Sequence, residues 1–205
     1  TPDKTSVVYI ADEKTAGVLE LFQVNIASPG VSDKLNGTLV SGGDVESFAI
    51  TPDGTAVVYL ANQNFNNVVE VFRVLFTNPQ ASVLLNPAFP NLSGKNVKKF
   101  AVTPDSTKVV YIANQETVSV DELFQVAFAN PQLSSTKLNN SPMVSGGNVT
   151  DFVIAPNSAS VVYRADQNLF QIFELFLAGI SGPGTGTSLN PPLLVSGQKV
   201  TTFAV

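Results

Sequence analysis

Short apolar runs separated by turn residues recur along the whole chain. In the run Val68–Leu75, Val68 and Phe72 fall on one face of a strand, and Val69 and Val71 fall on the other. Because both faces are apolar, we expect this strand to be covered on both sides, as between stacked sheets. For this part of the chain the pattern predicts the strands Val45–Ile50, Ala56–Ala61, Val68–Leu75 and Ser82–Asn86.

This pattern belongs to a unit that occurs four times, as residues 1–50, 51–102, 103–154 and 155–205. Each copy contains Val-Val-Tyr, then Glu-x-Phe, and ends on Val-x-x-Phe followed by two apolar residues. A period of about 50 residues made of short strands is typical of β-propeller blades. The sequence therefore predicts an all-β fold, a single β-propeller domain over 1–205 with four four-stranded blades.

The turn after the first strand of a copy reads Thr-Pro-Asp-Gly at Thr51–Gly54. Proline presets φ, aspartate bonds the nearby backbone and glycine tolerates a positive φ, so the motif recurs for reasons of folding. It lacks the alternating carboxylates of an EF-hand, and the glycine-rich stretch Gly179–Thr187 lacks the Gly-Lys-Ser/Thr of a phosphate loop. We expect neither a metal ion nor a cofactor.

A glutamate recurs in the third strand of every copy, at Glu20, Glu70, Glu122 and Glu174. Its apolar neighbours predict a buried carboxylate, which needs hydrogen-bond donors. No Lys or Arg recurs at a fixed place, so backbone amides or hydroxyl groups are expected to serve. A catalytic pair of carboxylates requires two different environments, whereas these repeat with the fold. We interpret them as structural.

Composition removes several function classes. The chain has no His and no Cys, so it can form neither a Ser-His-Asp triad nor a thiolate or histidine metal site. A net charge of −5, with 11 Lys and Arg, does not supply the basic surface that nucleic acid requires. No apolar run approaches the length of about 18 residues needed to span a bilayer. These observations predict a protein that is not an enzyme and has no nucleic-acid partner and no membrane span.

The Thr-Pro-Asp-Gly turn, the Val-x-Tyr strand and the Glu-Leu-Phe-x-Val strand together resemble the TolB-like β-propeller repeat family, over all four copies. The resemblance implies a periplasmic or secreted protein. Family members bind other proteins, or are propellers attached to hydrolase domains. The chain departs from the family in having four blades, where six or more are usual.

The two ends of the repeat complement each other. The chain starts at the turn Thr1-Pro2-Asp3, after a missing inner strand, and Lys199–Val205 is an inner strand with no turn after it. We expect Lys199–Val205 to pair beside Ser6–Ala11 and close the ring, which removes exposed edges. The same join between two chains would form an eight-bladed ring, so both a monomer and a homodimer fit. The chain is also readable as a segment of a longer array.

Positions that differ among copies are candidates for binding. Apolar side chains occur at the tips between strands two and three, at Phe65, Leu169 and Phe170, where solvent would select polar residues. Lys98 and Lys99 precede the inner-strand Phe at the end of the second copy, close to the expected central channel. We predict that Phe65, Lys98, Lys99 and Phe170 contact a partner. The competing interpretations are that the tips fold back onto the blade, that the charges pair along a solvated rim, or that an ion or small polar ligand binds at the channel.

These residues predict a non-enzymatic binding or structural module for protein–protein interaction. A carbohydrate-binding propeller and the propeller part of a larger hydrolase remain alternatives. Contact could also run through the opposite face, which carries the Thr-Pro-Asp turns and the long loops Asn25–Lys34, Leu75–Ser82, Ala127–Thr136 and Ala178–Ser188. Asn36, Asn91, Asn139 and Asn148 begin glycosylation motifs, which would matter only in a secretory pathway.

Overall fold

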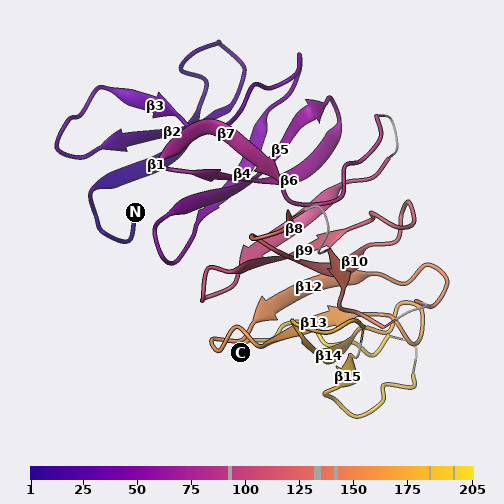
Figure 1. The fold of residues 1–205 in the computed structure, drawn as a ribbon. Coiled ribbons are helices and arrows are strands. Elements are labelled where there is room, and N and C mark those ends of the chain that lie inside the picture. The colour runs from indigo at the N-terminus through magenta and orange to yellow at the C-terminus, as the bar shows by residue number, and fades with distance from the viewer. Residues whose placement is uncertain (92–93, 132–134, 141–142, 185, 196) are drawn as a thin grey trace. The chain divides into compact units, whose positions relative to one another are not determined.

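The described residues form four antiparallel β-sheets, as the short apolar runs between turn residues predict (Figure 1). The structure, a computed structural model, describes residues 1–91, 94–131, 135–140, 143–184, 186–195 and 197–205. It divides into two compact units, Thr1–Asn96 and Val97–Val205, and each unit contains two sheets. Among the described residues, none forms a helix long and apolar enough to cross a membrane.

The first unit holds the first and second sheets. The first sheet has the order β1-β2-β3, and the second has the order β4-β5-β6-β7. Their bounds are β1 Ser6–Ala11, β2 Glu20–Asn25, β3 Ser32–Lys34, β4 Val45–Ile50, β5 Ala56–Phe65, β6 Val68–Leu75 and β7 Asn78–Leu84. The strands β4 and β6 match the predicted bounds. β7 begins earlier than predicted because Leu75 pairs with Asn78 across a tight hairpin, which replaces most of the expected loop Leu75–Ser82.

The second unit holds the third sheet, β8-β9-β10-β11, and the fourth sheet, β12-β13-β14-β15. Their bounds are β8 Val97–Val102, β9 Lys108–Ala113, β10 Glu122–Ala127, β11 Thr136–Lys137, β12 Val149–Ile154, β13 Ser160–Ala165, β14 Glu174–Gly179 and β15 Thr187–Ser188. The expected loops Ala127–Thr136 and Ala178–Ser188, and the stretch Gly179–Thr187, lie partly outside the described residues.

Each unit has its core between its two sheets. In the first unit Val8 and Leu21 pack with Val57, Tyr59 and Phe72 of the second sheet. The second unit repeats this arrangement with the corresponding residues of its sheets, Val110, Leu123, Val161, Tyr163 and Phe176. In each of the four sheets a stacked Tyr–Phe pair joins the strand of Val-Val-Tyr to the strand of Glu-x-Phe, with ring centroids 5.3–5.9 Å apart. The Val-Val-Tyr and Glu-x-Phe motifs therefore recur because they build the faces between sheets.

The Thr-Pro-Asp turn forms as its residues predict. Thr51 Oγ1 donates to Asp53 at 2.6 Å, the Thr55 amide donates to the same carboxylate at 3.0 Å, and Gly54 has φ +70°. In the other copies the position of Gly54 is taken by residues that also have a positive φ, namely Lys4, Ser106 and Ser158. The turn geometry is therefore kept even where glycine is absent.

The first sheet has three strands, and its β1 edge carries no inner strand. Val7 on this strand is 47% exposed, whereas Val57 and Val161 at the same repeat position are fully buried. Residues 199–205 form no strand; the Val200 amide donates to the Phe173 carbonyl of the fourth sheet at 2.8 Å. The structure thus shows sheets of propeller type, and ring closure through Lys199–Val205 stays a prediction.

Candidate binding site in the fourth sheet

The repeated glutamates are buried, as predicted, with exposures of 0–5%. The expectation about their partners was wrong for the first and third sheets. There Glu20 pairs with Lys34, and Glu122 pairs with Lys137 at 3.0 Å. Both lysines lie opposite the Phe of the Glu-x-Phe motif on the outer strand, so a lysine does recur at a fixed place. This recurrence of lysine could not be predicted from the sequence, because the outer strands are short and their register is set only by pairing with the neighbouring strand.

In the second and fourth sheets the carboxylate accepts hydrogen bonds from uncharged groups. Glu70 accepts from Asn64 Nδ2 at 2.7 Å and from the Phe89 amide at 3.1 Å. Glu174 accepts from Asn168 Nδ2 and the Leu193 amide, both at 3.1 Å. Backbone amides serve here as expected, and asparagines take the place of hydroxyl groups. Burial raises the pKa of Glu70, and these hydrogen bonds oppose the rise.

An asparagine ties the strand of the repeated glutamate to the chain that follows the outer strand; it is fully buried in the first three sheets and half-buried in the fourth. The side chains of Asn36, Asn86, Asn139 and Asn190 accept from the backbone amides of Leu21, Val71, Leu123 and Leu175 at 2.7–2.8 Å. Asn36 and Asn139 are fully buried, so the folded protein offers neither as a glycosylation acceptor. Repeated polar positions are thus structural in this fold, and candidate sites lie where the repeat breaks.

Phe65 and Phe170 occupy equivalent hairpin tips, in the first and second unit respectively. Phe65 is 37% exposed and Phe170 is 53% exposed, so neither is folded into a core. The ring of Phe170 lies against Gly146, where a Cβ would come within 2.8 Å of it and where φ is +79°. The tip between strands two and three therefore lies beside the loop that leads into an inner strand, as the propeller topology predicts.

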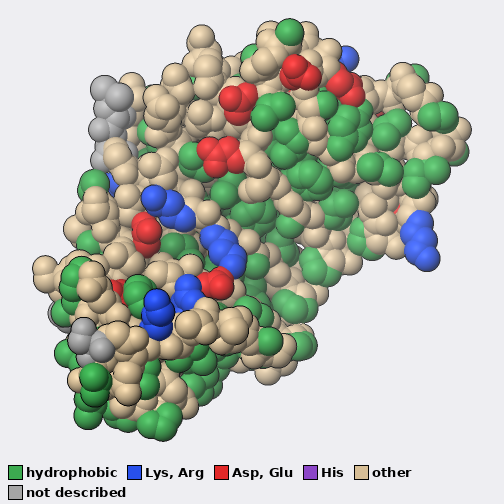
Figure 2. Space-filling view, turned by 180° about the vertical axis from the view of Figure 1, so that it is seen from behind, with side chains coloured by type: hydrophobic (Ala, Val, Ile, Leu, Met, Phe, Trp, Pro, Cys, Tyr) green, Lys and Arg blue, Asp and Glu red, His purple; other side chains and the backbone are tan. Residues whose placement is uncertain are grey.

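Lys98 and Lys99 both lie on β8 in the second unit. Lys98 is exposed and sits at the bulge between Val97 and Lys99. Lys99 forms an ion pair with Asp151, and its ammonium lies 5.4 Å from the centre of the Phe152 ring. Lys99 and Asp151 thus pair as the rim interpretation describes. On the face in Figure 2, most Lys and Arg side chains lie near Asp or Glu side chains.

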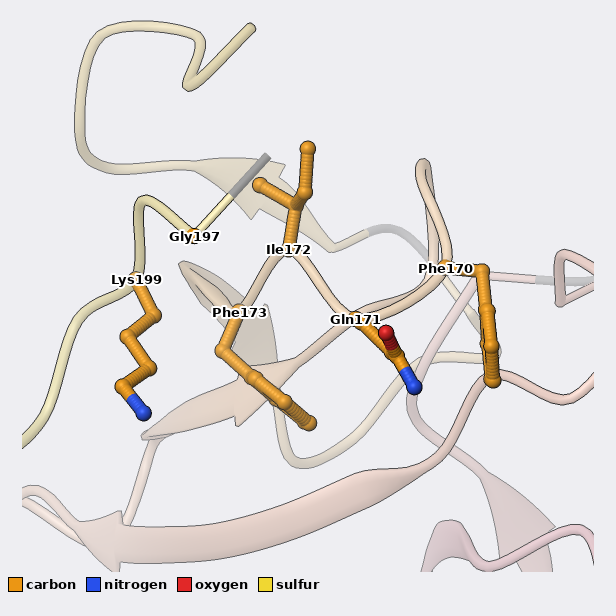
Figure 3. A pocket seen from close by; sticks show the side chains of 6 residues that line it. All are labelled: Phe170, Gln171, Ile172, Phe173, Gly197 and Lys199. Atoms are coloured by element: carbon orange, nitrogen blue, oxygen red, sulfur yellow. The ribbon is translucent and has the colours of Figure 1, made fainter. Parts of the chain in front are cut away.

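A cavity of about 550 Å³ opens beside Phe170 (Figure 3). It is lined by Phe170, Gln171, Ile172, Phe173, Gly197 and Lys199. The side chains of Phe170, Gln171, Phe173 and Lys199 extend to the same side of the loop, whereas Ile172 points the opposite way. An aromatic wall with an amide and an ammonium group at its rim suits the binding of a ligand.

A second cavity, of about 250 Å³, shares Phe173 and Lys199 with the first and adds Arg164. The guanidinium of Arg164 lies 5.8 Å from the centre of the Phe173 ring, and its Nη1 donates to the Thr201 carbonyl at 2.5 Å. Arg164, Phe173 and Lys199 were not among the binding residues predicted from the sequence. The sequence does mark Lys199 as different, since it occupies the position of Asp44, Asn96 and Asn148 in the other copies. Among the described residues no cluster of acidic side chains could hold a metal ion.

No protein-family model matches the chain, and no curated protein matches it by sequence. Solved structures do resemble it. A putative TolB from Agrobacterium tumefaciens has a TM-score of 0.58 and 13% identity, over 93% of this chain and 62% of that one. The chain therefore spans less than two thirds of that relative.

Longer peptidases resemble it equally well. A puromycin-hydrolysing peptidase from Mycobacterium tuberculosis has a TM-score of 0.61 and 11% identity, over 92% of this chain and 30% of that one. The tricorn protease has a TM-score of 0.61 and 12% identity, over 84% of this chain and 16% of that one. At such identities the likeness shows the fold alone. The sheets described above are those of a TolB-like β-propeller fold.

Proposed function

We propose that the chain is a non-enzymatic propeller module that binds a protein or peptide partner. The observation that carries this proposal is the exposed Phe170 at the rim of the cavity that also contains Phe173 and Lys199. Aromatic and cationic side chains around a pocket are typical of the energetically dominant part of a protein interface. Phe65 in the first unit, and Lys98 and Lys99 in the second, are proposed as further contact positions. A periplasmic or secreted location is proposed from the family resemblance.

Selection of peptides from a displayed library on the immobilised chain tests this function. The double variant Phe65→Ser/Phe170→Ser should lose affinity for the selected peptides by about tenfold or more, because truncating a central interface aromatic costs on the order of 2 kcal/mol. Its thermal midpoint should stay nearly unchanged, since both side chains are exposed. Ile26→Ser is the matched control: Ile26 is 56% exposed and lies in the loop Asn25–Lys34 on the competing face.

Three results would contradict the proposal. Failure to select any peptide above background would reject the proposed peptide-binding function. Loss of affinity in Ile26→Ser, with full affinity in the double variant, would move the site to the opposite face. A collapsed thermal midpoint in the double variant would place these phenylalanines in the core.

We also propose that residues 200–205 complete the first sheet, in the same chain or in a second copy. The Val200–Phe173 bond repeats the bonds that lead into β4 and β12, from Val45 to Leu19 at 2.8 Å and from Val149 to Asp121 at 2.7 Å. In the second sheet Ile50 pairs with Val57, and the same register would place Val205 opposite Val7. The chain has no native cysteine, so Val7→Cys/Val205→Cys should form a disulfide on oxidation, with Ile50→Cys/Val57→Cys as the positive control. A cross-link within one chain supports a monomeric ring, one between chains supports a dimer, and its absence rejects this pairing.

A second candidate function, the propeller part of a larger hydrolase, is favoured by the likeness to peptidases of which this chain spans 16–30%. Sequencing of the parent gene tests it. A hydrolase domain in the same reading frame would support this function, and a reading frame without one would reject it.

A further inference from the structure

At three of the four joints, where the chain passes from an outer strand to the next inner strand, a side-chain oxygen accepts a backbone hydrogen bond. The residue that precedes the Val of Val-x-x-Phe accepts a hydrogen bond from the backbone amide that precedes the repeated glutamate. These bonds run from Leu19 to Asp44, from Val69 to Asn96 and from Asp121 to Asn148, each with an N–O distance of 2.7 Å. The joint therefore demands an oxygen acceptor at a fixed place, and Asp or Asn supplies it.

The fourth joint lacks this acceptor. The corresponding residue is Lys199, whose ammonium group carries only donors. The backbone of the joint is nevertheless formed, because the Val200 amide donates to the Phe173 carbonyl as the Val45 amide does to Leu19 and the Val149 amide does to Asp121. Within the described part of the chain, neither the Phe173 amide nor the Lys199 ammonium donates a hydrogen bond to another protein group. The Phe173 amide thus lacks the side-chain acceptor that the other joints supply, and a cationic side chain stands at the sequence position of that acceptor.

The surroundings of this position are positively charged and partly apolar. Arg164 lies over the Phe173 ring and is held by Thr150 Oγ1 at 2.9 Å and by the Thr201 carbonyl. The nearby acid, Asp151, already forms an ion pair with Lys99. The cavity continues from Lys199 to the exposed ring of Phe170. A group bound here would meet donors at one end and an aromatic wall at the other.

We infer that this joint binds a carboxylate of a peptide partner, next to an apolar residue of the same peptide. This inference deepens the proposed peptide-binding function and rests on it. The carboxylate occupies the place of the missing Asp or Asn side chain and accepts from the Phe173 amide. Lys199 and Arg164 balance its charge, as is usual for charge-assisted hydrogen bonds. The neighbouring apolar residue packs against Phe170 and Phe173.

Titration with capped tripeptides, followed by the backbone amide resonances, tests the inference. Acetyl-Leu-Asp-Leu-amide should shift the Phe173 amide and bind about tenfold more tightly than acetyl-Leu-Asn-Leu-amide, because a hydrogen bond to a charged acceptor is the stronger one. Added salt should reduce this ratio. Acetyl-Leu-Leu with a free carboxyl end distinguishes a terminal carboxylate from a side-chain carboxylate as the preferred source.

Two variants of Lys199 separate the acceptor gap from the charge. Lys199→Asn introduces the side-chain acceptor that Asn96 and Asn148 provide at their joints. The Phe173 amide should then become protected from hydrogen exchange, and binding of the Asp peptide should be lost. Lys199→Met removes the charge without adding an acceptor; it should weaken binding about tenfold and leave the Phe173 amide in fast exchange.

Protection of the Phe173 amide in the free parent protein, or unchanged Asp-peptide affinity in Lys199→Asn, would overturn the inference. If peptides selected from the library depend on Phe170 but are indifferent to Lys199→Asn, the peptide-binding function stands and the carboxylate site fails. If the library yields no peptide and the Asp peptide does not bind, both fail.

Discussion

Replacing Glu70 with alanine tests whether the repeated glutamates stabilise the sheets. The Glu70 carboxylate accepts from the Phe89 amide at 3.1 Å and from Asn64 Nδ2 at 2.7 Å. These two donors differ in whether they can bond to water once the carboxylate is removed. Phe89 is only 2% exposed, so its amide cannot turn to water, whereas Asn64 lies at an exposed position and can be hydrated. The variant therefore leaves one buried donor without an acceptor.

An orphaned buried donor costs about 1–3 kcal/mol of the free energy of unfolding. With a urea dependence of about 1–3 kcal/mol per molar, the unfolding midpoint of Glu70→Ala should fall by about 1 M. Glu70→Gln keeps an oxygen for the Phe89 amide and should lose less than Glu70→Ala. Urea titration followed by circular dichroism measures both losses. Asp33→Ala, at an exposed acidic residue of the same unit, is the control and should change stability by less than about 0.5 kcal/mol.

The pH dependence provides an independent check of the same carboxylate. Burial raises the pKa of Glu70 in the folded protein above its ordinary value of 4.5. A raised folded pKa means that the contribution to stability is full below the unfolded pKa and is lost as the pH rises through the folded pKa. The stability of the parent relative to Glu70→Gln should therefore fall as the pH rises from about 4.5. A midpoint of Glu70→Ala equal to that of the parent, or a relative stability that grows with pH, would refute the structural role.

Two further predictions concern other repeated positions. Burial raises the pKa of Tyr59 and Tyr163 to about 12 from an ordinary 10. Their contribution to stability is therefore full below pH 10 and is lost as the pH rises through 12. In an alkaline titration, the absorbance of tyrosinate from these two residues should appear only when the protein unfolds, and their complete ionisation near pH 10 in a folded protein would contradict the burial. Asn139→Ala removes the acceptor of the buried Leu123 amide and should cost about 1–3 kcal/mol, measured by urea titration; an unchanged midpoint would show that this bond does not stabilise the sheet.

The strand order, the turn and the burial of the repeated residues followed from the sequence by itself. β4 and β6 begin and end at the predicted residues because an apolar run between turn-forming residues has few alternatives to a strand. The burial of Glu70 followed from its apolar neighbours on the same strand. These properties are local, since they depend on residues within one strand or one turn.

The partners across strands were decided only by tertiary structure. The pairing of Glu20 with Lys34 depends on the register of a three-residue outer strand, which local pattern does not specify. Lys199 looked like an ordinary variation until the structure showed Asn148 accepting from the Asp121 amide. In this fold a side-chain acceptor from one segment meets an amide donor from another, and the candidate site lies where that acceptor is missing. A single departure from that rule acquires meaning only when both segments are seen together.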